Sequence, residues 1–278
     1  MSEPAEDSCG ASERKTVLLI DGDVLAYLAF GYNRLSDDEI EQIVDTGSMS
    51  RSAIDRYIGK ALDRFFDMCN VVSELTFADE TFIAVQSPGP KFRTNIYPNY
   101  KAHRQAPSQY SNVLVPELRE RLVDMTAAVG SGVLETDDII RIKHTELMKE
   151  NHKPIVCSVD KDLLMIPGDH LRLKNNVALS QRITVNAYEA RSFFYRQLLI
   201  GDPVDNVKGV PKIGPKSAEA KLAWCFEEEE FRQEVVNAYA TCFKQGWRSE
   251  LELTGNMLHL LRTPEDFFSL EGWPAPSY

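Results

Sequence analysis

Acidic residues gather in four short clusters, each at the edge of an apolar segment. Carboxylates packed together repel one another strongly unless a cation lies between them. Oxygen ligands in such number, with no Cys or His cluster beside them, favour Mg²⁺ or Mn²⁺. Two ions about 3.5–4 Å apart would clamp the oxygens of a phosphoryl-transfer reaction, and the surplus of acids suits two. The clustered acids are Asp21, Asp23, Glu135, Asp137, Asp138, Asp160, Asp162, Asp202 and Asp205.

The spacing inside the clusters indicates which acids share a face. Glu135 and Asp138 are three positions apart and share one side of a helix start, whereas Asp137 points elsewhere unless the helix begins near it. Asp160 and Asp162 alternate, so on an extended segment they point the same way. A single cluster of this kind is more often a helix N-cap than a ligand set. Four clusters, two of them at strand ends, favour the metal site.

The segment over residues 86–110 mixes prolines with basic and aromatic residues. We expect it to form a surface loop or arch rather than part of the core. Its Tyr100 could stack on a nucleobase, while Lys101 and Arg104 could hold phosphates. Taken alone, however, this stretch is better interpreted as an ordinary exposed loop without a ligand.

Two glycines frame a second candidate site. Gly209 and Gly214 surround an apolar residue and precede a run of small residues, which predicts a tight hairpin between two helices. Exposed backbone N–H groups at a helix N-terminus can hold a phosphate. Lys212 and Lys216 add positive charge there. A helix-joining turn without a ligand explains the glycines alone nearly as well.

Apolar segments predict an α/β fold. Residues 16–20, 81–85 and 154–159 are typical of buried parallel strands, and acids follow the first and the third. In such sheets ligands bind at the carboxyl ends of the strands. Further predictions are helices at 24–32, 51–70, 116–129 and 135–149, a short strand or turn at 132–134, short strands at 171–173 and 181–184, a disordered tail at 1–15, an α/β domain at 16–185 and a helical domain at 186–278.

Composition restricts the class of protein without excluding a nucleic-acid partner. The 278 residues carry a net charge of −11, but without the nine clustered acids 33 acidic residues face 31 basic ones. Five separated cysteines with no CxxC pair indicate reduced thiols and a cytoplasmic protein. No apolar run approaches the roughly 20 residues that span a bilayer, so we expect no membrane partner.

Five stretches together resemble the 5′-nuclease superfamily of flap endonucleases and 5′-3′ exonucleases, in particular its short stand-alone phage members. They follow the family's order over roughly residues 16–225. The resemblance implies an α/β fold with a mostly parallel central sheet flanked by helices, which is a PIN-like core. It also implies an arch or loop over the active site and a C-terminal helix-3-turn-helix DNA-binding domain. The stretches are LLIDGDVLAYLAF, YPNYKAHR, LETDDII, VCSVDKDLLMIP and GDPVDNVKGVPKIGPKSA.

The resemblance also implies roles for single residues. Lys101 and Arg104 match the basic pair near the scissile phosphate and would be catalytic. The implied metal ligands are Asp21, Glu135 and Asp137, with Asp138 nearby, for a first Mg²⁺ or Mn²⁺, and Asp160, Asp162, Asp202 and Asp205 for a second. The implied nucleic-acid contacts are Arg93, Tyr100, Lys101, Arg104, Gly209, Lys212, Gly214 and Lys216, with the backbone of 207–213 and a K⁺ ion at the hairpin.

One position departs from the family's pattern. The second core strand of the family ends in an acid that serves the first metal, and the matching residue here is Gln86. An amide carries no charge and is a weaker Mg²⁺ ligand, so we expect a first site that needs more Mg²⁺ or prefers Mn²⁺. Asp79 and Glu80, just upstream, are the alternative match.

The expected function is a metal-dependent 5′-3′ exonuclease or 5′-flap endonuclease in DNA replication or repair. Its substrates would be DNA with 5′ ends or flaps, or an RNA–DNA hybrid, and its protein partners a replicative polymerase or a single-strand-binding protein. Two alternatives stay open. A PIN-type ribonuclease shares the acidic core but lacks the GDPVDNVKGVPKIGPKSA stretch. A DNA-junction binder that does not cut is motivated by Gln86.

Overall fold

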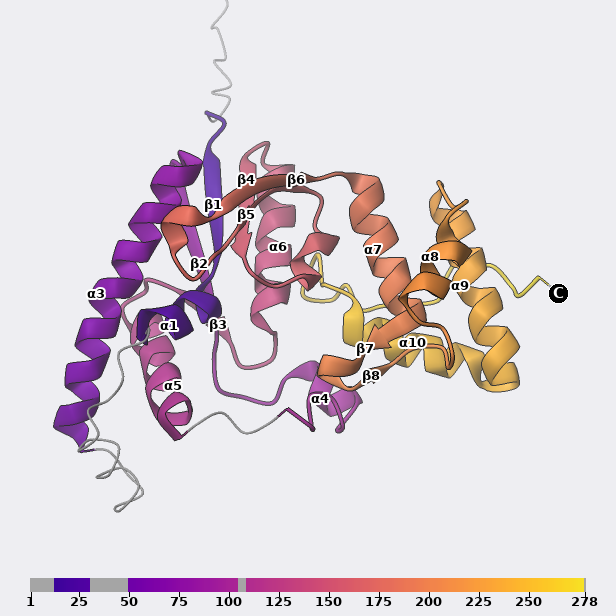
Figure 1. Ribbon diagram of the computed structural model, residues 1–278, viewed down its shortest axis with the longest axis horizontal. Helices are drawn as coiled ribbons and strands as arrows, with labels where there is room; N and C mark the ends of the chain where they lie inside the picture. Colours follow the sequence, from indigo (N-terminus) through magenta and orange to yellow (C-terminus); the bar gives the residue numbers. More distant parts are fainter. Residues whose placement is uncertain (1–12, 31–49, 105–108, 278) are drawn as a thin grey trace, which may run out of the picture.

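A six-stranded sheet lies at the centre of the computed structural model, which describes residues 13–30, 50–104 and 109–277 (Figure 1). The strand order is β3-β2-β1-β4-β5-β6, in which all neighbours pair in parallel except the antiparallel edge strand β6. The predicted mostly parallel sheet is therefore confirmed. The strands are β1 (Thr16–Asp21), β2 (Glu80–Gln86), β3 (Val129–Ser131), β4 (Lys153–Ser158), β5 (Gly168–Arg172) and β6 (Gln181–Val185).

Helices cover both faces of this sheet because its central strand is apolar on both sides. Leu18 and Ile20 of β1 pack in one cluster with Phe65, while Leu19 packs on the opposite face with Ile140. A strand that is buried on both faces needs such a continuous apolar run. The covering helices are α1 (Gly22–Phe30), α3 (Arg51–Thr76) and α5 (Gln109–Asp124) on the first face, and α6 (Thr136–Lys149) on the second (Figure 1).

The chain becomes mainly helical after β6. Asn186 and Glu189 cap each other's backbone N–H groups at 2.9 Å, which starts α7. Tyr195 of α7 packs with Phe231 of α9 in a separate apolar cluster. The elements of this part, at the right of Figure 1, are α7 (Ala187–Ile200), β7 (Gly201–Asp202), β8 (Val207–Lys208), α8 (Pro215–Leu222), α9 (Glu228–Phe243) and α10 (Trp247–Leu258). The short helices are α4 (Phe92–Ile96), η1 (Asp162–Met165), η2 (Val177–Leu179), η3 (Pro203–Asp205) and η4 (Lys244–Gly246).

Several local predictions differ from the structure. Residues 132–134, predicted as a short strand or turn, are a bend that follows β3, and β7 and β8 form a hairpin where the sequence pattern indicated helices only. Within the predicted surface segment, Phe92, Arg93 and Tyr100 are buried. The tail prediction falls mostly outside the described residues, and Lys15 at its end pairs with Glu80. The domain boundary at residue 185 stays a prediction.

No helix in the described part of the chain is long and apolar enough to cross a membrane.

Candidate active site

The carboxyl ends of three parallel strands bring the predicted acids to one edge of the sheet. Strand β1 ends at Asp21, β2 ends at Gln86, and Asp160 follows β4. Helix α6 starts directly after Glu135, which is its N-cap residue, so Asp137 lies in its first turn. From the sequence we expect Asp137 to point away from the other acids unless the helix begins near it. The observed start of α6 at Thr136 meets that condition.

Three of these acids, Asp21, Asp137 and Asp160, form no ion pair with a described residue, and we call them the unpaired carboxylates. Asp21 is buried and accepts a hydrogen bond from Ser158 Oγ at 2.6 Å. Burial and then the neighbouring Asp23 raise the pKa of Asp21 to about 7. Burial and then the charges of Asp160 and Asp21 raise the pKa of Asp137 well above its ordinary value. A bound cation would relieve this repulsion.

Arg93 holds a different set of carboxylates. Its guanidinium, 2% exposed, forms ion pairs with Asp138 and with Glu135 Oε2, the latter at 2.9 Å. Its Nε donates to the carbonyl oxygen of Met257 at 3.0 Å, and its Nη2 donates to that of His259 at 2.7 Å. All five N–H groups of this guanidinium are therefore used.

Two predicted site residues are contradicted by this arrangement. Arg93 is not a nucleic-acid contact, because it is buried and has no donor left for a phosphate. Asp138 is not a metal ligand, because it is fully buried and its oxygens accept from Arg93 and from the backbone N–H groups of Glu135 and Leu261, both at 3.3 Å. Both residues instead join the core to the segment after α10.

The basic loop lies against two of the acids. Lys101 forms an ion pair with Glu135, and its Nζ lies 3.7 Å from Asp205 Oδ2. Arg104 forms an ion pair with Asp205. Burial acts to raise the pKa of Glu135, but Lys101 and then Arg93 lower it overall. The predicted catalytic cations and two predicted metal ligands are thus brought together, already paired with one another.

Tyr100 does not face the solvent as a stacking platform would. Its ring is buried, and its hydroxyl lies 3.0 Å from Glu135 Oε2 and 3.2 Å from Asp205 Oδ2. The predicted stacking of Tyr100 on a base is therefore contradicted. The residue fastens the loop to the acids instead.

Two further predicted ligands, Asp162 and Asp202, both pair with Lys161. The sequence pattern did not single out this lysine. Its Nζ lies 2.7 Å from Asp202 Oδ2 and 3.1 Å from Asp162 Oδ1. Gln197 Nε2 also donates to Asp162 Oδ1 at 2.6 Å. Burial acts to lower the pKa of Lys161, but its hydrogen bond to Asp202 raises it. The alternation Asp-Lys-Asp at 160–162 was the available signal.

A cavity of about 20 Å³ lies among Glu135, Asp137, Asp162 and Asp205. Its volume suits a single water-sized occupant. The acidic donors are all carboxylate oxygens, which suit Mg²⁺ or Mn²⁺ better than softer metals. Among the described residues, however, no three acidic, His or Cys side chains converge closely enough to form a ready-made metal site. The carboxylate donors thus fit a divalent cation in their chemistry but not yet in their positions. Binding such an ion would require these side chains to move together.

The end of β2 faces Asp23. The Gln86 backbone N–H donates to Asp23 Oδ1 at 3.0 Å, and Thr136 Oγ1 donates to Asp23 Oδ2 at 2.6 Å. Arg119 of α5 forms an ion pair with Asp23 at 2.8 Å. Ser158 beside Asp21 and Arg119 beside Asp23 are site neighbours that the sequence analysis missed. Their positions depend on pairing between distant segments, and neither carried a recognisable motif.

The alternative match to Gln86 is excluded by the sheet. Asp79 accepts a hydrogen bond from the backbone of Thr16 at 2.7 Å, and Glu80 pairs with Lys15. Both contacts lie where β1 and β2 begin, at the opposite edge of the sheet from Asp21. Gln86 is therefore the β2 residue nearest the site.

The glycine hairpin predicted as a phosphate site connects β8 to α8. A Cβ on Gly209 would lie 2.3 Å from the carbonyl carbon of Ile200, so only glycine fits this close approach. Val210 N donates to Leu199 O at 2.8 Å and ties the hairpin to α7. The backbone contact explains Gly209 without a ligand.

The rest of the hairpin is open to solvent. Gly214 is the N-cap residue of α8, and a Cβ there would meet nothing within 4 Å. Lys212 and Lys216 are both exposed beside it. This surface leaves room for a phosphate, and its role in DNA binding stays a prediction.

A family model described as 5′-3′ exonuclease, N-terminal resolvase-like domain matches residues 16–194. The chain belongs to this 5′-3′ exonuclease family. It is 28% identical over 159 residues to a 5′-3′ exonuclease of Buchnera aphidicola, covering 54% of each protein. It is 29% identical over 137 residues to the flap endonuclease Xni of Shewanella amazonensis, covering 47% of this chain and 54% of Xni. The chain thus spans about half the length of these curated relatives.

Two solved structures share the fold of this chain. The T5 5′-exonuclease with divalent zinc bound superposes with a TM-score of 0.54 at 16% identity, covering 88% of this chain and 86% of that one. The bacteriophage T5 flap endonuclease, in a complex with DNA and metal ions, gives a TM-score of 0.54 at 13% identity, covering 86% and 99%. At this identity the likeness shows the 5′-3′ exonuclease fold alone.

Proposed function

We propose that the protein is a metal-dependent nuclease that hydrolyses phosphodiester bonds at the 5′ ends or 5′ flaps of DNA. The observation that carries this proposal is the group of unpaired carboxylates at the strand ends, with Lys101 and Arg104 on the adjoining loop. Acids that attract a cation and bases that attract a phosphate are both needed to cleave a polyanion. Membership of the 5′-3′ exonuclease family supports the same reaction.

The unpaired carboxylates would hold a first Mg²⁺ or Mn²⁺. Such an ion supplies an activated water and neutralises charge on the phosphate. Ser158 would orient Asp21 through the hydrogen bond that it already donates. The repulsion among Asp21, Asp137 and Asp160 makes them the acids with most to gain from a cation.

A second cation would be held by Asp162, Asp202 and Asp205. Lys161 and Arg104 already neutralise the last two of these acids. Entry of the ion therefore requires both basic side chains to turn away. Arg104, with Lys101, would then face the scissile phosphate and offset the charge that builds up there.

Duplex DNA would lie along the glycine hairpin. The backbone near Gly214 and the exposed Lys212 and Lys216 would contact phosphates without reading sequence. This placement puts the duplex beside β7 and β8, since β7 contains Asp202 and Asp205 lies between the two strands. A 5′ end could therefore pass from the hairpin to the carboxylates.

The test is cleavage of a 5′-flap duplex labelled at either end, in Mg²⁺, Mn²⁺ or EDTA. We expect metal-dependent products released from the 5′ side, and their lengths separate exonuclease from flap cleavage. Gln86→Asp should lower the Mg²⁺ concentration needed for half-maximal cleavage. An unchanged Mg²⁺ requirement would refute a role for position 86 in metal binding.

A second candidate is a DNA-junction binder that does not cut. It is favoured by the neutral Gln86 at the end of β2 and by the ion pairs that already neutralise Glu135 and Asp205. In the same assay this protein would bind the flap in Mg²⁺ and in Mn²⁺ but yield no product in either.

A further inference from the structure

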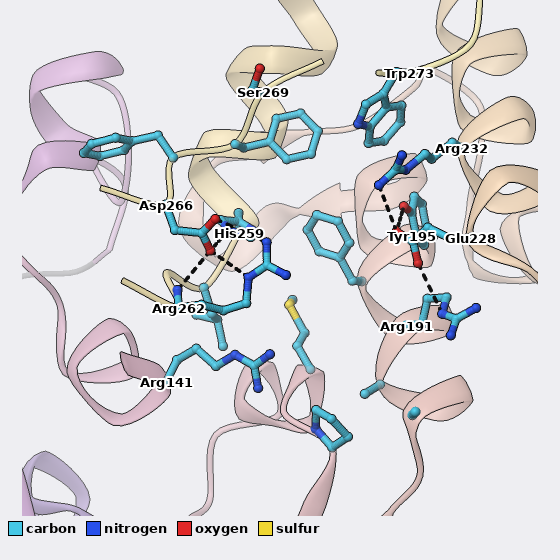
Figure 2. A pocket seen from close by; sticks show the side chains of 18 residues that line it. Arg141, Arg191, Tyr195, Glu228, Arg232, His259, Arg262, Asp266, Ser269 and Trp273 are labelled. Atoms are coloured by element: carbon cyan, nitrogen blue, oxygen red, sulfur yellow. Dashed lines mark hydrogen bonds and ion pairs between the residues drawn. The ribbon is translucent and has the colours of Figure 1, made fainter. Parts of the chain in front are cut away.

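A second cavity, of about 410 Å³, lies between the α/β core and the helical part (Figure 2). Residues from α6, α7, α9 and the segment after α10 line it. The volume falls in the range of about 300–1,000 Å³ that is typical of small-molecule sites. None of the acids of the candidate active site lines this cavity.

The lining is basic in a protein whose net charge is −11. Four arginines and two acids contribute to it. Glu228 is shared by Arg191 at 3.3 Å and by Arg232 at 3.6 Å. Both of these arginines are therefore paired with a carboxylate of the cavity itself. Figure 2 shows Arg232 beside Trp273, with Arg191 on the far side of Glu228.

On the opposite side only one of the two arginines is paired with a carboxylate. Asp266 forms an ion pair with Arg262 at 2.8 Å and contacts His259 Nε2 at 3.0 Å. Arg141 of α6 makes no hydrogen bond or ion pair through its guanidinium with any described residue. Figure 2 shows the guanidinium groups of Arg141 and Arg262 directed toward the same space. Two cations thus face one region with a single carboxylate between them.

This arrangement is unfavourable unless an anion completes it. Burial and then the charge of Arg262 lower the pKa of Arg141 to about 10, because both disfavour a second guanidinium there. The side chain is half-buried, so water compensates for its lost solvation only in part. A phosphate oxygen pair would satisfy both arginines at once, since guanidinium groups bind phosphate in a bidentate manner.

The rest of the lining is aromatic. Ring surface comes from Phe194, Phe268 and Trp273. The ring centroids of Phe268 and Trp273 lie 5.4 Å apart in an edge-to-face arrangement. A ligand that carries a flat ring and a phosphate would therefore find a matching surface for each part. Nucleotides have this combination of chemical groups.

We propose that this cavity binds the phosphate monoester of a nucleoside 5′-monophosphate, with the phosphate held by Arg141 and Arg262 and the base against the aromatic residues. The same phosphate monoester group occurs in two ligands, a free nucleotide and the phosphorylated 5′ end of a DNA strand. The site is separate from the carboxylates, and Leu260 is the one described residue that lines both cavities. The proposal does not depend on the nuclease activity.

The test is isothermal titration calorimetry of the full chain in EDTA, which keeps divalent cations away from the carboxylates. Deoxyadenosine 5′-monophosphate, inorganic phosphate and deoxyadenosine are titrated separately. We expect the nucleotide to bind more tightly than phosphate and deoxyadenosine to bind least. Absence of binding by both phosphate-containing ligands at millimolar concentration would overturn the proposal.

Variants assign the binding to the cavity. Arg141→Gln should weaken nucleotide binding at least tenfold without loss of thermal stability, because no ion pair is broken and the repulsion from Arg262 is removed. Arg141→Lys should give an intermediate affinity, since the charge remains and the bidentate contact is lost. Lys143→Gln, on the same helix and paired with Glu146 at 3.2 Å, is the matched control and should change affinity less than twofold. Equal affinities for Arg141→Gln and the control would refute the site.

A second comparison separates the two sources of phosphate. Single-stranded oligonucleotides with a 5′-phosphate or a 5′-hydroxyl are bound to the wild type and to Arg141→Gln in EDTA. A preference for the 5′-phosphate that disappears in Arg141→Gln assigns the cavity to DNA ends. Equal binding of both oligonucleotides, together with Arg141-dependent binding of the mononucleotide, assigns it to a free nucleotide.

Discussion

Asp137 and Asp138 are neighbours in the first turn of α6, yet their surroundings differ. Asp137 is half-buried and has no ion pair with a described residue, whereas Asp138 is fully buried and paired with Arg93. The same contrast separates Asp21 from Asp205, which is paired with Arg104. Acids that look alike in the sequence therefore form an unpaired group and a paired group.

The difference follows from helix geometry and from what lies on either side. Successive helical residues point about 100° apart, so one acid faces the strand ends and the next faces the segment after α10. The paired acids stabilise the fold, because each is neutralised by a basic side chain. The unpaired acids destabilise the fold slightly, because their negative charges repel one another. A bound cation would remove this repulsion. Changes in each group should therefore have opposite consequences for stability and activity.

The largest effect should come from the paired group. Arg93→Met removes the partner of a fully buried carboxylate, and we expect the free energy of unfolding to fall by about 3–5 kcal/mol. The measurement is urea denaturation followed by circular dichroism. Replacing both partners in Arg93→Met/Asp138→Leu should recover part of the loss, since no unpaired charge remains buried. If the free energy of unfolding of Arg93→Met fell by less than about 1 kcal/mol, Asp138 would not depend on Arg93 for its neutralisation.

The unpaired group should show the reverse. Asp137→Asn should reduce flap cleavage about 10²–10³-fold, as expected when a preorganised electrostatic group is lost. Its unfolding free energy should stay equal or rise, because repulsion from Asp160 and Asp21 is removed. Glu146→Gln, which is exposed on the same helix, serves as the control with unchanged cleavage. Cleavage by Asp137→Asn at the wild-type rate would end the distinction between the two groups.

A smaller effect should appear on changing pH without metal. The pKa of Asp21 is about 7 in the folded protein, above its unfolded value of about 3.9, so the folded state binds the proton more tightly. In EDTA, stability should rise as the pH falls from about 8 to about 5, by on the order of 2 kcal/mol more than in Asp21→Asn. Mg²⁺ should reduce this gain, because a cation favours the ionised carboxylate. Parallel pH profiles of both proteins in EDTA would contradict the assignment.

The smallest change in stability should come from Arg104. Its side chain is 51% exposed and its ion pair with Asp205 is accessible to water, so Arg104→Gln should alter the unfolding free energy by less than about 1 kcal/mol. Duplex binding should nevertheless weaken, and its dependence on the logarithm of salt concentration should become shallower by about one unit. Fluorescence anisotropy over a salt series measures this slope. An unchanged slope would leave Arg104 as a partner of Asp205 alone.

The central sheet could be predicted from the sequence because its signals are local. The apolar runs of β1, β2 and β4 each fit a buried strand, and acids stand directly after two of them. The burial of Arg93 could not be predicted in this way. Two of its acceptors, Met257 and His259, lie 164 and 166 positions further along the chain.

The sequence predicted which acids lie at the candidate site better than it predicted what each of them contacts there. The spacing of the acids located one edge of the sheet and predicted that Asp137 and Asp138 point in different directions, but it did not show that Asp138 pairs with Arg93. That separation depends on where α6 starts and on which segment packs against each face. The hairpin of β7 and β8 was missed because two-residue strands carry no periodic pattern.

The contacts of Arg93 also have a consequence for biosynthesis. A ribosome makes the acids of α6 early, whereas the carbonyl groups of Met257 and His259 that complete the coordination of Arg93 come only with residues 257–259. Until then a buried cation lacks two of its partners, and the wall formed by Leu258 and Leu260 beside the carboxylates is missing. A nascent chain therefore cannot complete these contacts of Arg93 before residues 257–259 have been made.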